Sequence, residues 1–210
     1  VEKVWNDKED QDGKRPGSVT VKLLADKVDT GKTLELNSTN QWKGSFEDLD
    51  EYKGGKKIEY TLEEVTVSGY TTSITKSSNG YVVTNSHTPE TTEVSGKKTW
   101  NDKEDQDGKR PKEITINLYA DGVKKDSKKV TASENWSWKF DNLAKYAKGQ
   151  LINYTITEDV VKDYTSDVSG YNVTNTYTPG KTSVPVEKVW NDKEDQDGKR
   201  PGSVTVKLLA

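Results

Sequence analysis

The chain of 210 residues has no cysteine, no methionine and a single histidine, His87. Without cysteine it cannot form the disulfides that stabilise many small secreted domains, so it either has no covalent staple or uses a different one. One histidine and no cysteine leave too few ligands for a zinc site and give no basis for a Ser–His or Cys–His nucleophile. We therefore expect no metal and no cofactor.

Long apolar runs and a strong charge of one sign are also missing. No segment approaches the roughly 18–20 apolar residues that a membrane-spanning helix needs. The net charge of −3 gives no electrostatic basis for binding nucleic acid or an anionic membrane. Because the chain starts at Val1 without a signal peptide, we expect an internal fragment of a longer protein, with its targeting signals outside this segment.

What the sequence does have is repetition. The stretch Asn-Asp-Lys-Glu-Asp-Gln-Asp-Gly-Lys-Arg-Pro occurs three times, each time after a Trp, at Asn6–Pro16, Asn101–Pro111 and Asn191–Pro201. Residues 1–25 recur unchanged as residues 186–210. The spacing of 95 and then 90 residues is the size of a domain rather than of a solenoid unit. We predict one domain at 1–90, a second at 91–180, and the N-terminal part of a third at 181–210.

The pattern inside each repeat is that of strands. Apolar and β-branched residues alternate over short segments, and turn signals such as Asp12-Gly13, Asn79-Gly80 and Asp121-Gly122 separate them. The strands predicted in this way are Ser18–Ala25, Ile58–Val65 and Tyr81–Asn85, with counterparts Glu113–Ala120, Leu151–Val160 and Tyr171–Asn175. Helix is expected at most as one or two turns, at Glu47–Lys53 and Asn142–Ala147. Short strands with frequent turns predict an all-β sandwich for each repeat.

Strand alternation turns three polar residues of each repeat inward with the apolar ones. Residues two apart on a strand share a face. The inward polar residues are Lys3, Glu64 and Asn85 in the first repeat and Lys98, Glu158 and Asn175 in the second. The neighbouring Lys97 and Glu63 fall on the opposite face. Burial of a charge costs several kcal/mol unless the charge is paired or neutralised, so these residues require an explanation.

Two interpretations are open on these residues alone. One is a buried Lys–Glu ion pair capped by an asparagine. The other is a covalent cross-link, because a lysine desolvated among apolar groups can act as a neutral amine nucleophile. A neutral carboxylic acid beside it could polarise the asparagine carbonyl, and attack by the amine would expel ammonia and leave an isopeptide bond. A folded core would hold the groups in contact and so supply most of the acceleration.

Four motifs occur twice in the same order: Lys-x-Trp-Asn-Asp, Gln-Asp-Gly-Lys-Arg-Pro, Tyr-Thr-x-x-Glu and Val-Thr-Asn. This order resembles the Cna protein B-type domain, which forms the repeated stalks of Gram-positive surface proteins and pilins. The resemblance covers nearly the whole chain. It implies a Greek-key β-sandwich of inverse immunoglobulin type that carries a Lys–Asn isopeptide bond assisted by an acidic residue.

Carried over residue by residue, the resemblance implies an isopeptide bond between Lys3 and Asn85, assisted by Glu64, in the first domain. In the second domain it implies a bond between Lys98 and Asn175, assisted by Glu158. Lys188 matches the lysine of the third repeat, but the sequence ends before a Glu or Asn partner.

Two further features have competing interpretations. Asp10, Asp12 and Gly13 match part of a calcium-loop pattern, but its first and closing ligand positions are Lys8 and Val19, which favours a solvated turn with surface ion pairs. Three tryptophans could stack on a sugar or could pack in the core, and the equivalent places of Trp42 and Trp136 in the two repeats favour packing. The tryptophans concerned are Trp42, Trp136 and Trp138.

From these observations we expect a structural spacer in an adhesin or pilus-like stalk. We expect it to be extracellular and cell-wall anchored, with the anchor outside this segment. Its partners would be the neighbouring repeats, and a host extracellular-matrix ligand would be bound by other domains. The alternative is that the repeats themselves bind a host ligand. A third class, a metabolic enzyme, lacks any recognisable pocket chemistry.

Overall fold

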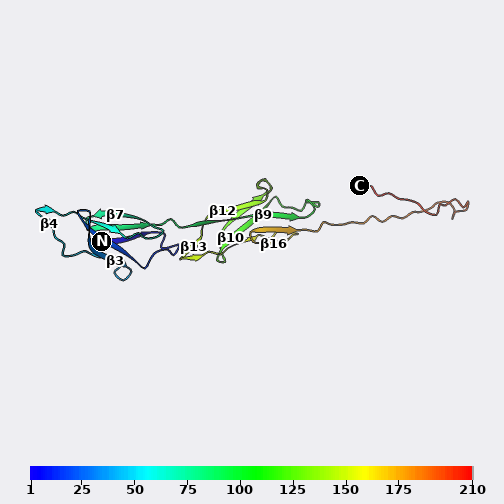
Figure 1. The fold of residues 1–210 in the computed structure, drawn as a ribbon. Helices are drawn as coiled ribbons and strands as arrows, with labels where there is room; N and C mark the ends of the chain where they lie inside the picture. The colour runs from blue at the N-terminus through cyan, green and yellow to red at the C-terminus, as the bar shows by residue number, and fades with distance from the viewer. Residues whose placement is uncertain (210) are drawn as a thin grey trace.

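The computed structural model describes residues 1–209 and consists almost entirely of strands and turns. Figure 1 shows an elongated molecule in which the strands of the first repeat are followed by those of the second, and then by an extended C-terminal segment. Among residues 1–209 the only helix is the 3₁₀ turn Ala132–Glu134. This part of the chain has no helix of the length and apolar character that would cross a membrane.

Each repeat forms its own set of strands. In the first repeat these are β1 (Glu2–Asn6), β2 (Ser18–Ala25), β3 (Val28–Asn37), β4 (Tyr52–Lys53), β5 (Lys56–Lys57), β6 (Tyr60–Glu64), β7 (Thr71–Ser77) and β8 (Gly80–Ser86). In the second they are β9 (Thr91–Asn101), β10 (Glu113–Ala120), β11 (Val123–Thr131), β12 (Ser137–Ala144), β13 (Tyr146–Ala147), β14 (Gln150–Leu151), β15 (Tyr154–Glu158), β16 (Thr165–Ser169) and β17 (Asn172–Thr176).

Two main sheets build each repeat. The first repeat has the sheets β1-β8-β7 and β3-β2-β6, and the second has β12-β9-β17-β16 and β11-β10-β15. The first and last strands of each repeat pair in parallel, β1 with β8 and β9 with β17, whereas the other pairs are antiparallel. Because the connection between parallel strands cannot be a tight turn, the whole repeat lies between them in sequence.

Apolar side chains from both sheets meet between the layers. In the second repeat Val94 and Val173 of one sheet join Ile116, Leu118 and Ile156 of the other in a single buried cluster. The first repeat has a smaller cluster built in the same way, from Val19, Val21, Leu36 and Val83. Burial of such side chains stabilises a fold by roughly 1.5–3 kcal/mol each. The predicted all-β sandwich is thus confirmed.

The two short helices expected from the sequence were wrong. Tyr52–Lys53 forms a two-residue strand paired with Lys56–Lys57. Asn142–Ala144 belongs to β12, where the register shifts between Phe140 and Leu143 and Asn142 takes a positive φ of 55°. A bulge places apolar residues three apart on one face of a strand, which imitates the spacing of a helical turn.

The C-terminal segment has no strand from residue 177 to residue 209. We call the turn at residues 7–13, and its copies at 102–108 and 192–198, the acidic loop. The third copy keeps the turns of the other two although no strand follows it up to residue 209. The valines that are core residues in the first repeat have exposed equivalents here, such as Val204 and Val206.

Candidate functional site

Parallel pairing of the first and last strands brings the inward lysine and asparagine of each repeat together. In the first repeat Lys3 pairs with Val83 and Trp5 with Asn85. Side chains alternate along a strand, so Lys3 and Asn85 lie on the same inward face of adjacent strands. Lys3 is only 4% exposed, and Asn85 is fully buried.

The second repeat has the same arrangement. Val173 pairs with Lys98, and Asn175 pairs with Trp100. Lys98 is 2% exposed, and Asn175 has no exposed surface. Two buried lysines in equivalent places are unusual, because lysine is almost never fully buried unless it has a partner.

The partner is a glutamate from the opposite sheet. Lys3 Nζ lies 3.7 Å from Oε1 of Glu64 at the end of β6, and both side chains are removed from solvent. Lys98 Nζ lies 2.6 Å from Oε1 of Glu158 at the end of β15, also without solvent contact. The amine and the acid therefore meet in the interior of each repeat, and the strand register places the asparagine on the same inward face as the lysine.

The environment shifts the pKa of both lysines downward, toward the neutral form. Burial lowers the pKa of Lys3 to about 8, although Glu64 acts in the opposite direction. Burial likewise lowers the pKa of Lys98, opposed by its hydrogen bond to Glu158. The indole of Trp5 lies 4.0 Å from Lys3 Nζ, and that of Trp100 lies 4.7 Å from Lys98 Nζ. A lysine in such a pocket has a deprotonated, nucleophilic amine available at moderate pH.

The asparagine amides are not fully satisfied. Within residues 1–209, Asn85 Nδ2 has no hydrogen-bond partner, and Asn175 has none for either Nδ2 or Oδ1. Leaving a buried polar atom unpaired costs about 1–3 kcal/mol, so such atoms need a reason. An amide nitrogen that leaves as ammonia would have no need of a partner.

The sequence reasoning missed a hydroxyl residue in each site. Thr72 Oγ1 on β7 lies 2.6 Å from Glu64 Oε2 and 3.0 Å from Asn85 Oδ1, within hydrogen-bond distance of both. In the second repeat Ser166 Oγ donates to Glu158 Oε2 at 3.0 Å. The sequence signal that could have identified these residues is a hydroxyl residue two places after a tyrosine in both repeats.

The other lysines and the glutamate considered in the sequence analysis lie outside the two buried sites. Lys97 and Glu63 are exposed, as strand alternation indicated. Lys188 of the third repeat is exposed, and its Nζ donates to its neighbour's carbonyl, Val189 O, at 2.8 Å. No site of the kind found in the two full repeats is assembled around Lys188 within the described residues.

The tryptophans pack as predicted rather than forming an exposed platform. Trp42 stacks edge-on against Trp5 with ring centroids 5.3 Å apart, and Trp136 does the same against Trp100 at 5.1 Å. Trp138 is 5% exposed and belongs to the core of the second repeat.

The acidic loop differs from the solvated turn that we expected. Asp7 and Asp12 are buried, at 2% and 7% exposure. Arg15 donates to both carboxylate oxygens of Asp7, at 3.0 and 2.6 Å, and Tyr70 donates a third hydrogen bond to Asp7. The prediction of weak surface pairs was wrong for this pair, because the arginine and the tyrosine cover the carboxylate.

Comparison with known proteins shows which family the sequence resembles. The sequence matches the Cna protein B-type domain over residues 1–86, 94–176 and 184–210. It is 50% identical over 210 residues to a collagen adhesin of Staphylococcus aureus, and it spans 18% of the length of that relative.

The solved structure that the chain matches over most of its length gives the same result. The crystal structure of two B repeat units of the S. aureus collagen-binding protein is 49% identical, with a TM-score of 0.81, over 96% of this chain and 54% of that one. A single B repeat unit of that protein is 45% identical, with a TM-score of 0.41, over 85% of this chain and 96% of that one. The chain belongs to the family of Cna protein B-type domains.

Proposed function

We propose that this chain is a structural spacer of a bacterial surface adhesin, in which each complete repeat is closed by its own Lys–Asn isopeptide bond. The relative at 50% identity is named a collagen adhesin, and the chain covers only 18% of it. We place ligand binding in parts of the protein outside these repeats, and we place the whole at the cell surface, anchored to the wall by segments outside this one. The domain bounds that we propose are 1–90, 91–180 and 181–210.

The reaction joins Lys3 to Asn85 and Lys98 to Asn175. In the first repeat the neutral amine of Lys3 attacks Cγ of Asn85, a new Nζ–Cγ bond forms and the Cγ–Nδ2 bond breaks. One proton passes from Nζ to the departing Nδ2, which leaves as ammonia. Atoms and charge balance without an oxidant, a metal or a second substrate.

Glu64 and Glu158 act as the proton carriers. In the reaction each acid takes a proton from the lysine amine and later delivers it to the departing amide nitrogen. The protonated acid can then hydrogen-bond toward the amide carbonyl and stabilise the charge that develops on its oxygen. In the first repeat Thr72 lies between Glu64 Oε2 and Asn85 Oδ1 and is placed to relay that hydrogen bond.

The observation that carries the proposal is the meeting of a buried lysine, a buried glutamate and a buried, unsatisfied asparagine at equivalent places in both repeats. An ion pair alone explains the lysine and the glutamate but gives no reason for unpaired amide nitrogens. Each repeat reacts once and on itself, so the chain is not an enzyme in the sense of turnover.

Peptide mapping tests the proposal. The denatured chain is digested and the fragments are sequenced by mass spectrometry. We expect branched peptides in which Lys3 is joined to Asn85 and Lys98 to Asn175, whereas Lys188 appears in a linear peptide. Recovery of all four residues only in linear, unmodified peptides would overturn the proposal and leave the ion-pair interpretation.

A further inference from the structure

The acidic loop is the one feature repeated without change three times, and the isopeptide site does not account for it. Its backbone is strained in the same way in every copy. Lys8, Glu9 and Asp10 have consecutive positive φ values of 51°, 58° and 60°, and the residues at 103–105 and 193–195 have the same sign. Runs of non-glycine residues in this region are uncommon, and such strain gathers at functional positions.

Internal hydrogen bonds hold that conformation. Asp7 Oδ1 accepts the N–H of Asp10 at 3.0 Å, and Asp10 Oδ1 accepts the N–H of Arg15 at 2.9 Å. The second copy has the same bonds, from Asp105 to Asp102 and from Arg110 to Asp105.

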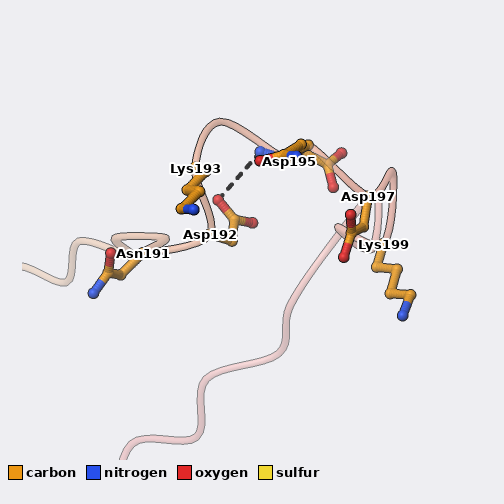
Figure 2. Close-up of a pocket in the computed structure, with 7 residues that line it drawn as sticks. Asn191, Asp192, Lys193, Asp195, Asp197 and Lys199 are labelled. Carbon is orange, nitrogen blue, oxygen red and sulfur yellow. Dashed lines mark hydrogen bonds between the residues drawn. The ribbon is translucent and has the colours of Figure 1, made fainter.

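The third copy of the loop keeps these bonds although no sandwich surrounds it. Arg200 donates its N–H to Asp195 at 2.9 Å and its Nε to Asp192 at 2.8 Å. Figure 2 shows this copy, with Asp192 and Asp195 joined across the turn and Asp197 beside the pocket that the loop encloses. The loop is therefore a local unit that does not depend on the rest of the repeat.

The aspartate near the tip of the loop holds the segment that leaves the repeat. Asp12 Oδ2 accepts the backbone N–H of Glu90 at 2.7 Å and lies 2.9 Å from Nε2 of His87. At the second junction Asp107 Oδ2 accepts the N–H of Gly180 at 2.8 Å and the hydroxyl of Tyr177 at 2.9 Å. The same carboxylate oxygen thus makes the same pair of contacts at both junctions.

The first copy of the loop also touches the next repeat directly. Gln11 O accepts the N–H of Gly149, which lies in the turn between β13 and β14, at 3.1 Å. A Cβ built on Gly149 would lie 3.0 Å from Cα of Gly13, so the two backbones meet without room for a side chain. Glycine on both sides is what such a close approach requires.

A linker residue bridges the two repeats by charge. Glu90 accepts Lys14 Nζ of the first repeat at 2.7 Å and Lys145 Nζ of the second at 2.8 Å. The backbone carbonyl of Glu90 also accepts the N–H of Lys145 at 3.0 Å. These partly exposed ion pairs are individually weak, about 0–1 kcal/mol, but they add to the backbone bonds.

We propose that the acidic loop is an inter-repeat clasp whose partner is the following repeat of the same chain. Asp12 binds the linker through the N–H of Glu90, and the tip of the loop at residues 11–13 contacts the β13–β14 turn of the next repeat. Only residues 87–90 separate β8 from β9, and they are bonded to both repeats, so the junction has little freedom to bend. In this proposal the sequence of the loop is unchanged because each copy would meet the same kind of turn in a complete following repeat; among residues 1–209 only the first copy does so, since a Cβ on Gly108 or Gly198 would meet nothing within 4 Å. The clasp goes beyond the spacer role proposed above and does not depend on the isopeptide bond.

The test measures the spread of distances between the two repeats in the full chain. The absence of cysteine allows two spin labels to be placed uniquely, by Lys32→Cys and Lys125→Cys at exposed positions of β3 and β11. Double electron–electron resonance should give one narrow distance distribution for this labelled parent. Gly149→Val should broaden the distribution, because the added side chain cannot fit against Gly13.

Matched controls separate the clasp from general damage. Gly55 occupies the equivalent turn of the first repeat, with a φ of 77° against 75° for Gly149, but a Cβ there would meet nothing within 4 Å. Gly55→Val therefore carries the same backbone strain and should leave the distribution narrow. Asp12→Ala should broaden it as well, and Asp107→Ala, at the other junction, should not.

The result that would overturn the clasp is an unchanged distribution in both Gly149→Val and Asp12→Ala, or an already broad one in the parent. The intact mass of the same samples reports the isopeptide bonds independently. A narrow distribution without cross-links would support the clasp and contradict the cross-link, and cross-linked domains with a broad distribution would do the reverse.

Discussion

Lys98 Nζ and Glu158 Oε1 lie 2.6 Å apart in the interior of the second repeat, where the two side chains are 0% and 1% exposed. The equivalent pair in the first repeat, Lys3 and Glu64, is separated by 3.7 Å. A buried pair of this kind contributes little net stability by itself, because the desolvation of both groups offsets their attraction. Its presence in both repeats is better explained by the chemistry that it permits with the adjacent asparagine.

The first prediction concerns the acids. Glu64→Gln keeps the shape of the side chain but removes the proton carrier, so the Lys3–Asn85 bond should not form. The second repeat, with Glu158 intact, should still react and serves as a control within the same molecule. The intact mass of the variant should show the loss of one ammonia molecule, and a loss of two would remove Glu64 from its assigned role.

The second prediction concerns Thr72, which lies within hydrogen-bond distance of Glu64 Oε2 and Asn85 Oδ1. Thr72→Val preserves the volume and removes the hydroxyl, so cross-linking in the first repeat should become slower without loss of the fold. The measurement is the cross-linked fraction against time after cell-free synthesis, read by mass.

The neighbouring Thr71, whose hydroxyl donates to Ser86 O at 3.4 Å and not to a residue of the site, provides the control for this experiment. Thr71→Val should react at the rate of the parent chain. If Thr72→Val also did so, the hydroxyl would only fill space in the site, and the relay that we assign to it would be wrong.

The third prediction concerns stability. Lys3 and Asn85 are 82 positions apart in the sequence, on the first and last strands of the repeat. By analogy with a disulfide closing a loop of that length, the bond should raise the free energy of unfolding by about 4–5 kcal/mol through the unfolded state. Lys3→Met retains the apolar stem and removes the amine, so the first repeat should unfold at lower temperature while the second is unchanged. Equal melting of the variant and the parent would contradict the account.

Strand alternation was sufficient to predict which lysines, glutamates and asparagines are buried, whereas their role in a cross-link was implied by the resemblance and stays a proposal. Because the period of a strand is two residues, the choice of Lys98 over Lys97 and of Glu64 over Glu63 follows from the sequence once each strand is recognised. The contacts of Thr72 could not be predicted in this way, because they depend on the register of β7 against β8, in which Thr72 pairs with Asn85. Register depends on packing between strands that are distant from the local pattern.

The acidic loop shows the other limit of sequence reasoning. A run rich in Asp, Lys and Gly is usually a solvated turn, and nothing in its composition indicates that Asp12 is buried by the linker at His87 and Glu90. That burial arises from residues about 75 positions further along the chain. The perfect repetition of the loop was the available signal, but it does not identify the partner.

The fourth prediction is that the first junction responds to pH. His87 Nδ1 lies 2.9 Å from Gly69 O and Nε2 lies 2.9 Å from Asp12 Oδ2, so both ring nitrogens face acceptors and the protonated ring satisfies both. The hydrogen bond to Asp12 raises the pKa of His87, with Lys14 acting in the opposite direction. The ring of Tyr70 packs against the histidine at 5.4 Å.

The direction of the response follows from the raised pKa. The stabilisation is complete below the ordinary histidine value of about 6.5 and is lost as the pH rises through the raised pKa of His87. The inter-repeat distance distribution should therefore broaden on going from about pH 5.5 to about pH 8.5. His87→Tyr reproduces the residue found at the second junction, Tyr177, and should remove the dependence on pH. A dependence that persisted in this variant would show that another group is responsible.

The central claim is that two buried Lys–Glu–Asn sites have each formed an isopeptide bond, and the intact mass of the purified chain tests it most directly. Denaturation before the measurement removes any contribution from non-covalent contacts. The account predicts a mass lower than that of the sequence by two ammonia molecules, one for Lys3 with Asn85 and one for Lys98 with Asn175. A mass equal to that of the unmodified sequence would contradict it and leave two buried ion pairs in place of two cross-links.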